Sequence, residues 1–228
     1  MELNGNDLSA LWITLQLASV TCVILLMIST PLAWWLARSR SRWAGSIEAI
    51  VALPLILPPT VIGFYLLLAF SPQSWLGNAW LTLFGNSLAF SFSGLVIGSL
   101  IYSLPFVVQP LQTGFQQFDS RLLEAAETMG ANKIDQFVNL VFPITRRAFV
   151  TAGLLGFAHT VGEFGIVLMI GGNIPGETQV LSIALYDHVE ALNYQHAHWM
   201  AGGLLLFSFL LLVTLYSLNR RSGQAGYK

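Results

Sequence analysis

The chain has 228 residues, of which 55% are hydrophobic and only 9% are charged, and its net charge at pH 7 is −1. A soluble domain carries about 25% charged residues, so this chain has too few polar side chains to cover a globule in water. The composition excludes a water-soluble protein and predicts an integral membrane protein. The single cysteine, Cys22, excludes an intramolecular disulfide.

Five hydrophobic segments are long enough to cross the hydrocarbon core of a membrane, which takes about 20 residues of helix. In chain order they are 11–36, 47–70, 88–111, 149–170 and 199–217. The first ten residues contain acids but no lysine or arginine, so we expect a retained first span rather than a cleaved signal peptide. The sequence predicts an all-α, multi-pass membrane protein with five transmembrane helices in a single domain, 1–228.

The basic residues predict the orientation of the chain. All ten lie on one side of the membrane if the N-terminus is outside, whereas 71–87 and 171–198 on the other side contain none. Positively charged segments stay in the cytoplasm, so we expect the N-terminus outside and the C-terminus inside. The ten residues are Arg38, Arg40, Arg42, Arg121, Lys133, Arg146, Arg147, Arg220, Arg221 and Lys228.

The second hydrophobic segment contains three prolines, Pro54, Pro58 and Pro59. Each lacks a backbone N–H, and a broken helix is tolerated in a membrane where neighbours or a water-filled cavity satisfy the freed carbonyls. Two interpretations remain open. Either the segment lines a transport pathway and bends as a gate moves, or it is a static kink that serves packing.

The third and fourth segments carry small residues four apart, at Gly94 and Gly98 and again at Ala152 and Gly156. Such spacing allows two helices to approach closely. The contact formed in this way lies either within the subunit or at a seam between two copies of the chain.

A long loop, 112–148, separates the third and fourth segments on the cytoplasmic side. Apolar residues at helical spacing predict a helix over 122–129, which Gly130 ends in the left-handed conformation. A second amphipathic stretch, 134–141, is expected to end at Pro143. A helix–turn–helix that is half apolar and half charged, held at the membrane surface, is suited to the cleft of a protein partner.

This loop resembles the EAA loop of permeases from binding-protein-dependent importers, the type I ABC importers with a MetI-like fold. The motif reads E-A-A, three residues, G, nine residues, I-x-L-P, and here Leu and Phe replace its Ile and Leu. The resemblance implies that the loop is a coupling helix inserted into a groove of a separate ATPase. The residues at the motif positions are Glu124, Ala125, Ala126, Gly130, Leu140, Phe142 and Pro143.

Two other stretches are similar to the molybdate permease family. They are 53–59, which reads LPLILPP, and 162–178, which contains GEFG and then NIPGET. Sulfate and thiosulfate permeases share parts of both stretches, but the run 173–178 favours molybdate, with tungstate as an open alternative. The resemblance implies a homodimer in the lipid of a bacterial inner membrane, with two cytoplasmic ATPase subunits and a periplasmic molybdate-binding protein.

Glu163 is the one acid well inside an expected span, and His159 lies four residues earlier on the same helix face. Acids within a membrane usually face the bundle interior and have a role. An ionised carboxylate repels an oxyanion, so we do not expect Glu163 to bind substrate directly. A gating or dimer-contact role and a purely structural pairing both remain open.

The other polar clusters of the sequence do not predict a nucleotide-binding, catalytic or metal-binding site. Residues 171–178 lack the lysine of a nucleotide P-loop, so ATP hydrolysis is expected on a partner. We expect no catalytic activity, metal, cofactor or nucleic-acid partner, and a short helix within 180–192. The alternatives are a membrane enzyme, or a channel or secondary carrier that would not need the 124–143 loop. Five outer residues match no strong metal-ligand pattern: Asp187, His188, Glu190, His196 and His198.

Overall fold

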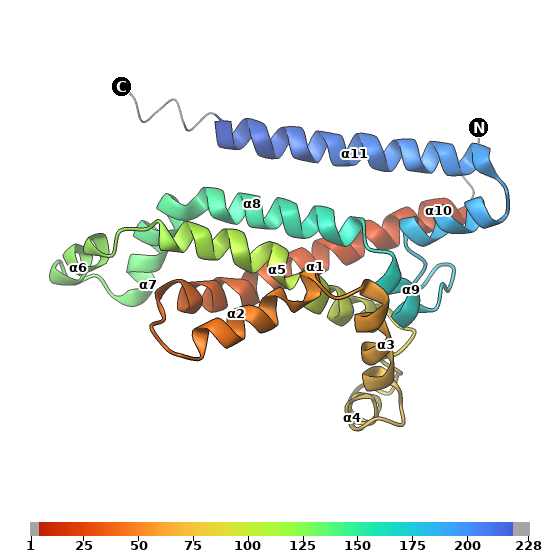
Figure 1. Cartoon of the computed structure of the whole chain (residues 1–228), viewed down its shortest axis with the longest axis horizontal. Coiled ribbons are helices and arrows are strands. Elements are labelled where there is room, and N and C mark those ends of the chain that lie inside the picture. The colour runs from red at the N-terminus through yellow and green to blue at the C-terminus, as the bar shows by residue number, and fades with distance from the viewer. Residues whose placement is uncertain (1–4, 221–228) are drawn as a thin grey trace.

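The structure is a computed structural model that describes residues 5–220, with side chains described for 5–217. All regular secondary structure in this part is helical (Figure 1). Two of the basic residues that predict the orientation, Arg221 and Lys228, lie outside the described residues, and Arg220 is described by its backbone only.

Three long helices, α1 (Gly5–Arg38), α5 (Phe92–Gln116) and α8 (Phe142–Val161), pack against one another along the molecule (Figure 1). Small residues allow this packing. A Cβ added at Gly156 would lie 2.5 Å from Val107 Cγ2 on α5, and one at Gly98 would lie 2.2 Å from Ile170 Cδ1. The small-residue spacing in these two helices therefore serves packing within the subunit.

The buried apolar side chains form two main clusters along these helices. One cluster includes Leu17 and Leu95, and the other includes Leu25, Val107 and Val108. Helices α1 and α5 contribute to both. The stretch of α5 between the clusters carries buried serines instead, so a polar layer separates the two halves of the core.

The second hydrophobic segment, expected as one span over 47–70 that its prolines kink or break, is broken in the structure. It consists of α2 (Ala44–Ala52), a 3-10 turn η1 (Leu53–Leu55) and α3 (Pro59–Phe70), and the two halves are bent by 106°. A proline disfavours the helical region for the residue before it, and Pro58, which precedes Pro59, has ψ of 136°.

The fourth hydrophobic segment also differs from the expected span, 149–170. Its helix runs from Lys133 through α7 (Lys133–Gln136) and the π-helical η2 (Phe137–Val141) to the end of α8. Pro143 therefore does not end a helix. It lies in the first turn of α8, where the missing N–H of a proline is tolerated. The helix stops at Val161 instead, and α9 (Gly165–Gly171) begins after a break.

The remaining helices surround this core. Helix α9 packs against α3, and α4 (Trp75–Phe84) follows α3. Helix α10 (Leu181–Glu190) matches the short helix expected within 180–192. Helix α11 (Tyr194–Arg220) lies along one edge, against α10 and α8 (Figure 1). Four helices are long and apolar enough to span a membrane, or five if the broken pair is one span.

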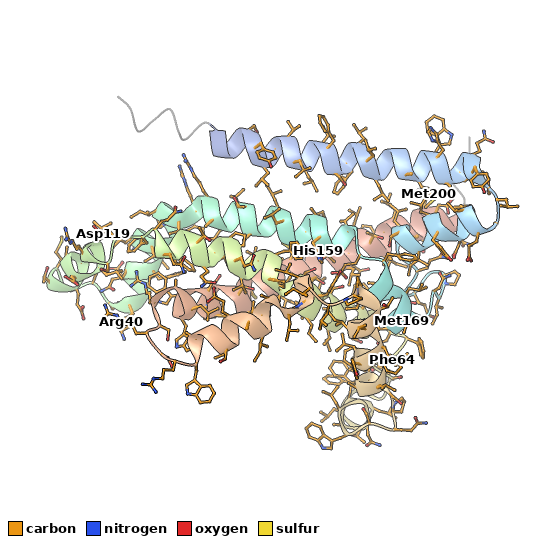
Figure 2. All side chains as sticks on the ribbon, in the orientation of Figure 1. Arg40, Phe64, Asp119, His159, Met169 and Met200 are labelled. Carbon is orange, nitrogen blue, oxygen red and sulfur yellow. The ribbon has the colours of Figure 1, made fainter. Side chains whose placement is uncertain are left out.

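One end of the bundle gathers the ends of several helices that carry basic residues. Arg38 ends α1, and Arg121 and Lys133 begin α6 (Arg121–Thr128) and α7. Figure 2 shows Arg40 and Asp119 at this end and Met200 at the opposite one. The sequence asymmetry in basic residues thus corresponds to the two ends of the folded molecule.

Candidate functional site

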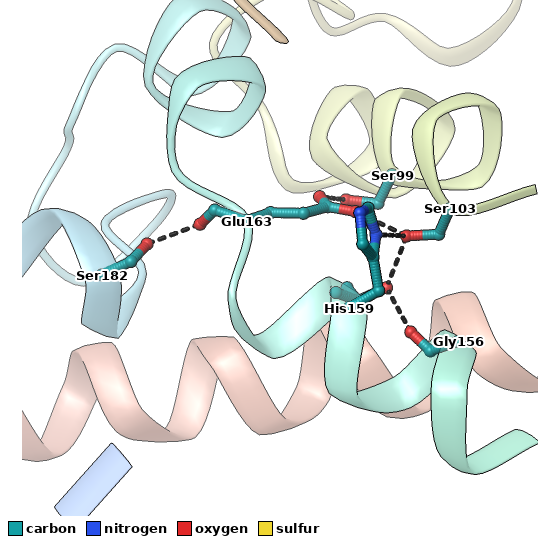
Figure 3. Close-up of polar contacts among 7 residues, drawn as sticks. Ser99, Ser103, Gly156, His159, Glu163 and Ser182 are labelled. Carbon is teal, nitrogen blue, oxygen red and sulfur yellow. Dashed lines mark hydrogen bonds and ion pairs between the residues drawn. The ribbon is translucent and has the colours of Figure 1, made fainter. Parts of the chain in front are cut away.

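The polar layer consists of Ser99 and Ser103 on α5, His159 and Thr160 near the end of α8, and Glu163 in the break before α9 (Figure 3). The two serines are four residues apart, so they point from one face of α5 toward α8. Only 3% of Glu163 is exposed. A buried carboxylate needs hydrogen-bond donors to offset the loss of water.

The two serines supply those donors. Ser99 Oγ donates to Glu163 Oε2 at 2.5 Å, and Ser103 Oγ donates to Oε1 at 2.7 Å (Figure 3). Hydrogen bonds to an ionised acceptor are short and about twice as strong as neutral ones. The carboxylate therefore ties the α8–α9 break to the middle of α5.

His159 completes the layer. Its Nδ1 lies 2.8 Å from Ser103 Oγ and 3.7 Å from Glu163 Oε1. Its ring stacks on Phe106, with centroids 3.8 Å apart, and lies close to Tyr102. The sequence predicted the proximity of His159 and Glu163 from one continuous helix. The helix ends before Glu163, but the pair stays within 4 Å because the backbone continues as a hydrogen-bonded turn, in which the amide of Glu163 donates to the oxygen of Thr160.

The backbone of the break is held from a third helix. Ser182 Oγ on α10 donates to the backbone oxygen of Glu163 at 2.5 Å (Figure 3). The sequence did not predict Ser182 at this site, nor Ser99 and Ser103 as partners of the acid. The four-residue spacing of the two α5 serines was the available signal, whereas nothing in the sequence marks Ser182.

A cavity of about 510 Å³ borders the polar layer. Of the residues expected at a gate, Pro59, His159 and Glu163 line it, but Pro54 and Pro58 are not among its lining residues. The hydroxyl-bearing Thr60 and Tyr102 complete its polar side. The N-terminus of α3 reaches this place because residue 165 is a glycine, where a Cβ would lie 3.2 Å from that of Pro59.

The second candidate site is the coupling segment, which we define as 121–143. It contains all the motif residues: 124–126 on α6, 130 in the turn after α6, 140 on η2, and 142–143 at the start of α8. As expected, Gly130 has a positive φ, +86°, and follows the end of α6. The amide of Ala131 donates to the oxygen of Ala126, which satisfies a carbonyl at the helix end.

The coupling segment presents large apolar side chains at its surface. Met129 is 87% exposed, Ile134 78%, Val138 53% and Phe142 45%. Leu140 is half-buried and packs against the adjacent core cluster. Such a concentration of exposed apolar side chains at one end of a protein is typical of a contact surface for another molecule.

Outer acids and histidines contact other protein side chains. Asp187 accepts hydrogen bonds from Asn173 and Gln179, and His188 Nε2 lies 3.0 Å from Asp7 Oδ1. Within residues 5–220, no group of three or more histidine, cysteine, aspartate or glutamate side chains is arranged to hold a metal ion.

Comparison with known sequences gives a consistent result. Residues 29–223 match the family described as binding-protein-dependent transport system inner membrane component. The chain is 56% identical, over 96% of its length and 97% of the relative's, to the molybdenum transport system permease protein ModB of Azotobacter vinelandii. It is 31% identical, over 97% of its length and 79% of the relative's, to the sulfate transport system permease protein CysT of Escherichia coli K12.

Solved structures share the fold at low sequence identity. A bacterial alginate ABC transporter in complex with alginate pentasaccharide-bound periplasmic protein matches with a TM-score of 0.75 and 14% identity, covering 94% of this chain and 78% of that one. The MetNI methionine ABC transporter matches with a TM-score of 0.67 and 16% identity, covering 93% and 94%. The expected MetI-like fold is confirmed.

These matches, together with the helical bundle, define a membrane permease, a transport subunit rather than an enzyme. The chain belongs to the family of binding-protein-dependent transport system inner membrane components. The resemblance drawn from its motifs is confirmed, and membership of this family implies an ATPase and a substrate-binding protein as partners.

Proposed function

We propose that the chain is the permease of an importer for molybdate, with tungstate as a second substrate, driven by ATP hydrolysis on a separate subunit. The observation that carries the proposal is the 56% identity to a molybdenum permease over nearly the full length of both chains. More distant molybdenum and sulfate permeases are about equally similar to this chain, at 30–34% identity.

Uptake of radiolabelled molybdate tests this proposal. The chain is expressed with its ATPase and binding protein in cells that lack molybdate uptake of their own. We expect ATP-dependent uptake that excess tungstate suppresses and excess sulfate does not. Uptake of labelled sulfate in place of molybdate would favour the alternative, a sulfate or thiosulfate permease.

We propose that the coupling segment docks in a groove of the ATPase through Glu124, Ala125, Ala126, Gly130, Leu140, Phe142 and Pro143. The exposure of Met129 and Ile134 beside these positions supports this role, because a groove that covers apolar side chains gains hydrophobic free energy. A membrane enzyme or a channel would have no need for this surface.

The transport pathway, in this proposal, passes the cavity lined by Pro59, His159 and Glu163, and the break at Pro54 and Pro58 lets α3 move as a gate. The 106° bend supports a hinge at this place. Replacing Pro58 and Pro59 by alanine should reduce uptake per folded complex without loss of bound ATPase. The exposed Pro72, replaced by alanine, is the matched control; equal uptake by both variants would indicate a static kink.

The proposed assembly is a homodimer of single-domain chains with two ATPases and a periplasmic binding protein, in a bacterial inner membrane. Each chain crosses five times, with the N-terminus outside and the C-terminus inside, an arrangement that the basic residues at one end of the bundle support. In a Cys22→Ser background, a membrane-impermeant thiol reagent should label Glu177→Cys from outside but not Ser120→Cys. Labelling of Ser120→Cys alone would reverse the orientation.

A further inference from the structure

The hydrogen bonds of the polar layer influence which nitrogen of His159 carries a proton. The hydroxyl of Ser103 has one hydrogen, and with that hydrogen donated to Glu163 Oε1 its oxygen accepts at its other contacts. Those contacts are His159 Nδ1 at 2.8 Å and Thr160 Oγ1 at 3.0 Å, and the Thr160 hydroxyl can donate either to Ser103 or to the backbone oxygen of Gly156. This arrangement favours a proton on Nδ1 of His159, which leaves Nε2 as the other position for a proton.

The Nε2 atom is on the side of the ring away from Ser103. His159 lines the 510 Å³ cavity, 19% of its side chain is exposed, and Nε2 has no hydrogen-bond partner among the residues that the structure describes. The titratable groups that face the ring are Glu163, from the α8–α9 break, and Tyr102, from α5; α3 faces the same cavity with Pro59 and Thr60.

Among residues 5–217, whose side chains the structure describes, no lysine or arginine would otherwise offer an oxyanion a positive charge at this level. Those of this part lie in the loops and near helix ends, away from the layer between the two apolar clusters. A dianion away from bulk water needs donors, preferably charged ones. The oxygens of Glu163 accept from Ser99 and Ser103, and its side chain is only 1% exposed although the residue borders the cavity.

We propose that protonated His159 donates its Nε2–H to the oxyanion as it passes the cavity. This inference rests on the proposed function. Glu163 is a positioning residue, because it orients Ser103 and, through it, favours the proton on Nδ1. A single hydrogen bond from one side chain holds the oxyanion weakly enough for release, as conduction requires.

The first test concerns the tautomer and needs no transport. In 15N NMR of the purified permease, the His159 signal is assigned by its loss in His159→Gln. In the neutral form of His159, the proton should be on Nδ1. A neutral His159 that carries its proton on Nε2 would overturn the inference.

The second test is molybdate uptake into proteoliposomes with the complete complex, from about pH 5 to pH 8, the range in which histidines titrate. Uptake by the wild type should fall as the pH rises, because the charged donor is lost. His159→Gln should give a flat profile and about tenfold slower uptake at low pH, since a neutral donor replaces a charge-assisted one. His198, an exposed outer histidine, gives the matched control: His198→Gln should keep the wild-type dependence of uptake on pH.

ATP hydrolysis, measured in parallel, separates effects on the partner from effects on the pathway. An unchanged pH profile in His159→Gln, with molybdate still imported, would overturn the role of His159 and leave the proposed function standing. A wild-type complex that imports no molybdate at any pH would overturn the proposed function, and the role of His159 toward the oxyanion with it.

Discussion

In the polar layer, Ser99, Ser103 and Glu163 are buried and hydrogen-bonded to one another, whereas in the coupling segment Met129 and Ile134 are among the most exposed apolar side chains of the chain. Both regions place residues against the usual preference, with charge inside and hydrophobes outside. In the polar layer, the polar groups form hydrogen bonds with one another within the chain. In the coupling segment, the apolar side chains stay exposed and are available for contact with another molecule.

This difference separates two kinds of functional surface. A buried carboxylate without donors would cost several kcal/mol, so the polar layer must be complete in the isolated subunit. Exposed apolar side chains cost little to an isolated subunit and stabilise a complex when a partner covers them. Changes in the polar layer should therefore affect the stability of the permease, and changes in the coupling segment should affect its assembly.

The largest expected effect comes from replacing both Met129 and Ile134 by aspartate. Loss of two central interface side chains should cost about 4 kcal/mol of ATPase binding, close to a thousandfold in affinity. Co-purification and titration with the ATPase measure it, and thermal unfolding of the permease alone should stay unchanged. Leu192 is 72% exposed at the opposite end of the molecule, so Leu192→Asp is the control. Equal ATPase affinity in all variants would contradict the docking role.

Replacing Glu163 by leucine should destabilise the permease itself. Both serine hydroxyls lose a charged acceptor inside the protein, and we expect a loss of about 3 kcal/mol in the free energy of unfolding. Chemical or thermal unfolding in detergent measures this loss. Glu177 is an exposed acid in the loop before α10, and Glu177→Leu should unfold like the wild type. If the two variants were equally stable, the hydrogen bonds of the layer would be unimportant for the fold.

Replacing Gly130 by valine tests the turn between α6 and α7. A side chain at φ of +86° costs about 1–2 kcal/mol, and nothing lies within 4 Å of the added Cβ, so the effect is backbone strain alone. We expect weaker ATPase binding and slower coupled uptake, with partial rescue by asparagine. Gly85 has φ of +74° and an equally open position after α4, so Gly85→Val carries similar strain without touching the ATPase. A channel would be insensitive to both.

Replacing Ser182 by alanine should have the smallest effect. It removes one hydrogen bond to the backbone oxygen of Glu163, which is worth about 1 kcal/mol. The unfolding midpoint in detergent should fall slightly, and ATPase binding should not change. Ser208, exposed on α11, gives the matched control Ser208→Ala. A loss of ATPase binding in Ser182→Ala would show that the two regions are coupled and not separable.

Local signals in the sequence were sufficient where the structure depends on near neighbours in the chain. The helix over α6, the left-handed Gly130 and the interruption at the prolines of the second segment all follow from the backbone preferences of a few adjacent residues. The gathering of basic residues at one end of the molecule was predicted from their positions between the hydrophobic segments. Pro143 was misinterpreted because the π-helical turn before it, which lets the helix continue, leaves no clear pattern in the residues.

Only the tertiary structure decided what surrounds Glu163. The sequence singled out the acid and its histidine, because an ionisable residue in an apolar segment is conspicuous, but the partners Ser99, Ser103 and Ser182 lie between 19 and 64 residues away on two other helices. Serines are common and their hydroxyls act only at hydrogen-bond distance. Which of them face the acid is set by how α5, α8 and α10 pack, and that packing depends on the whole core rather than on any local pattern.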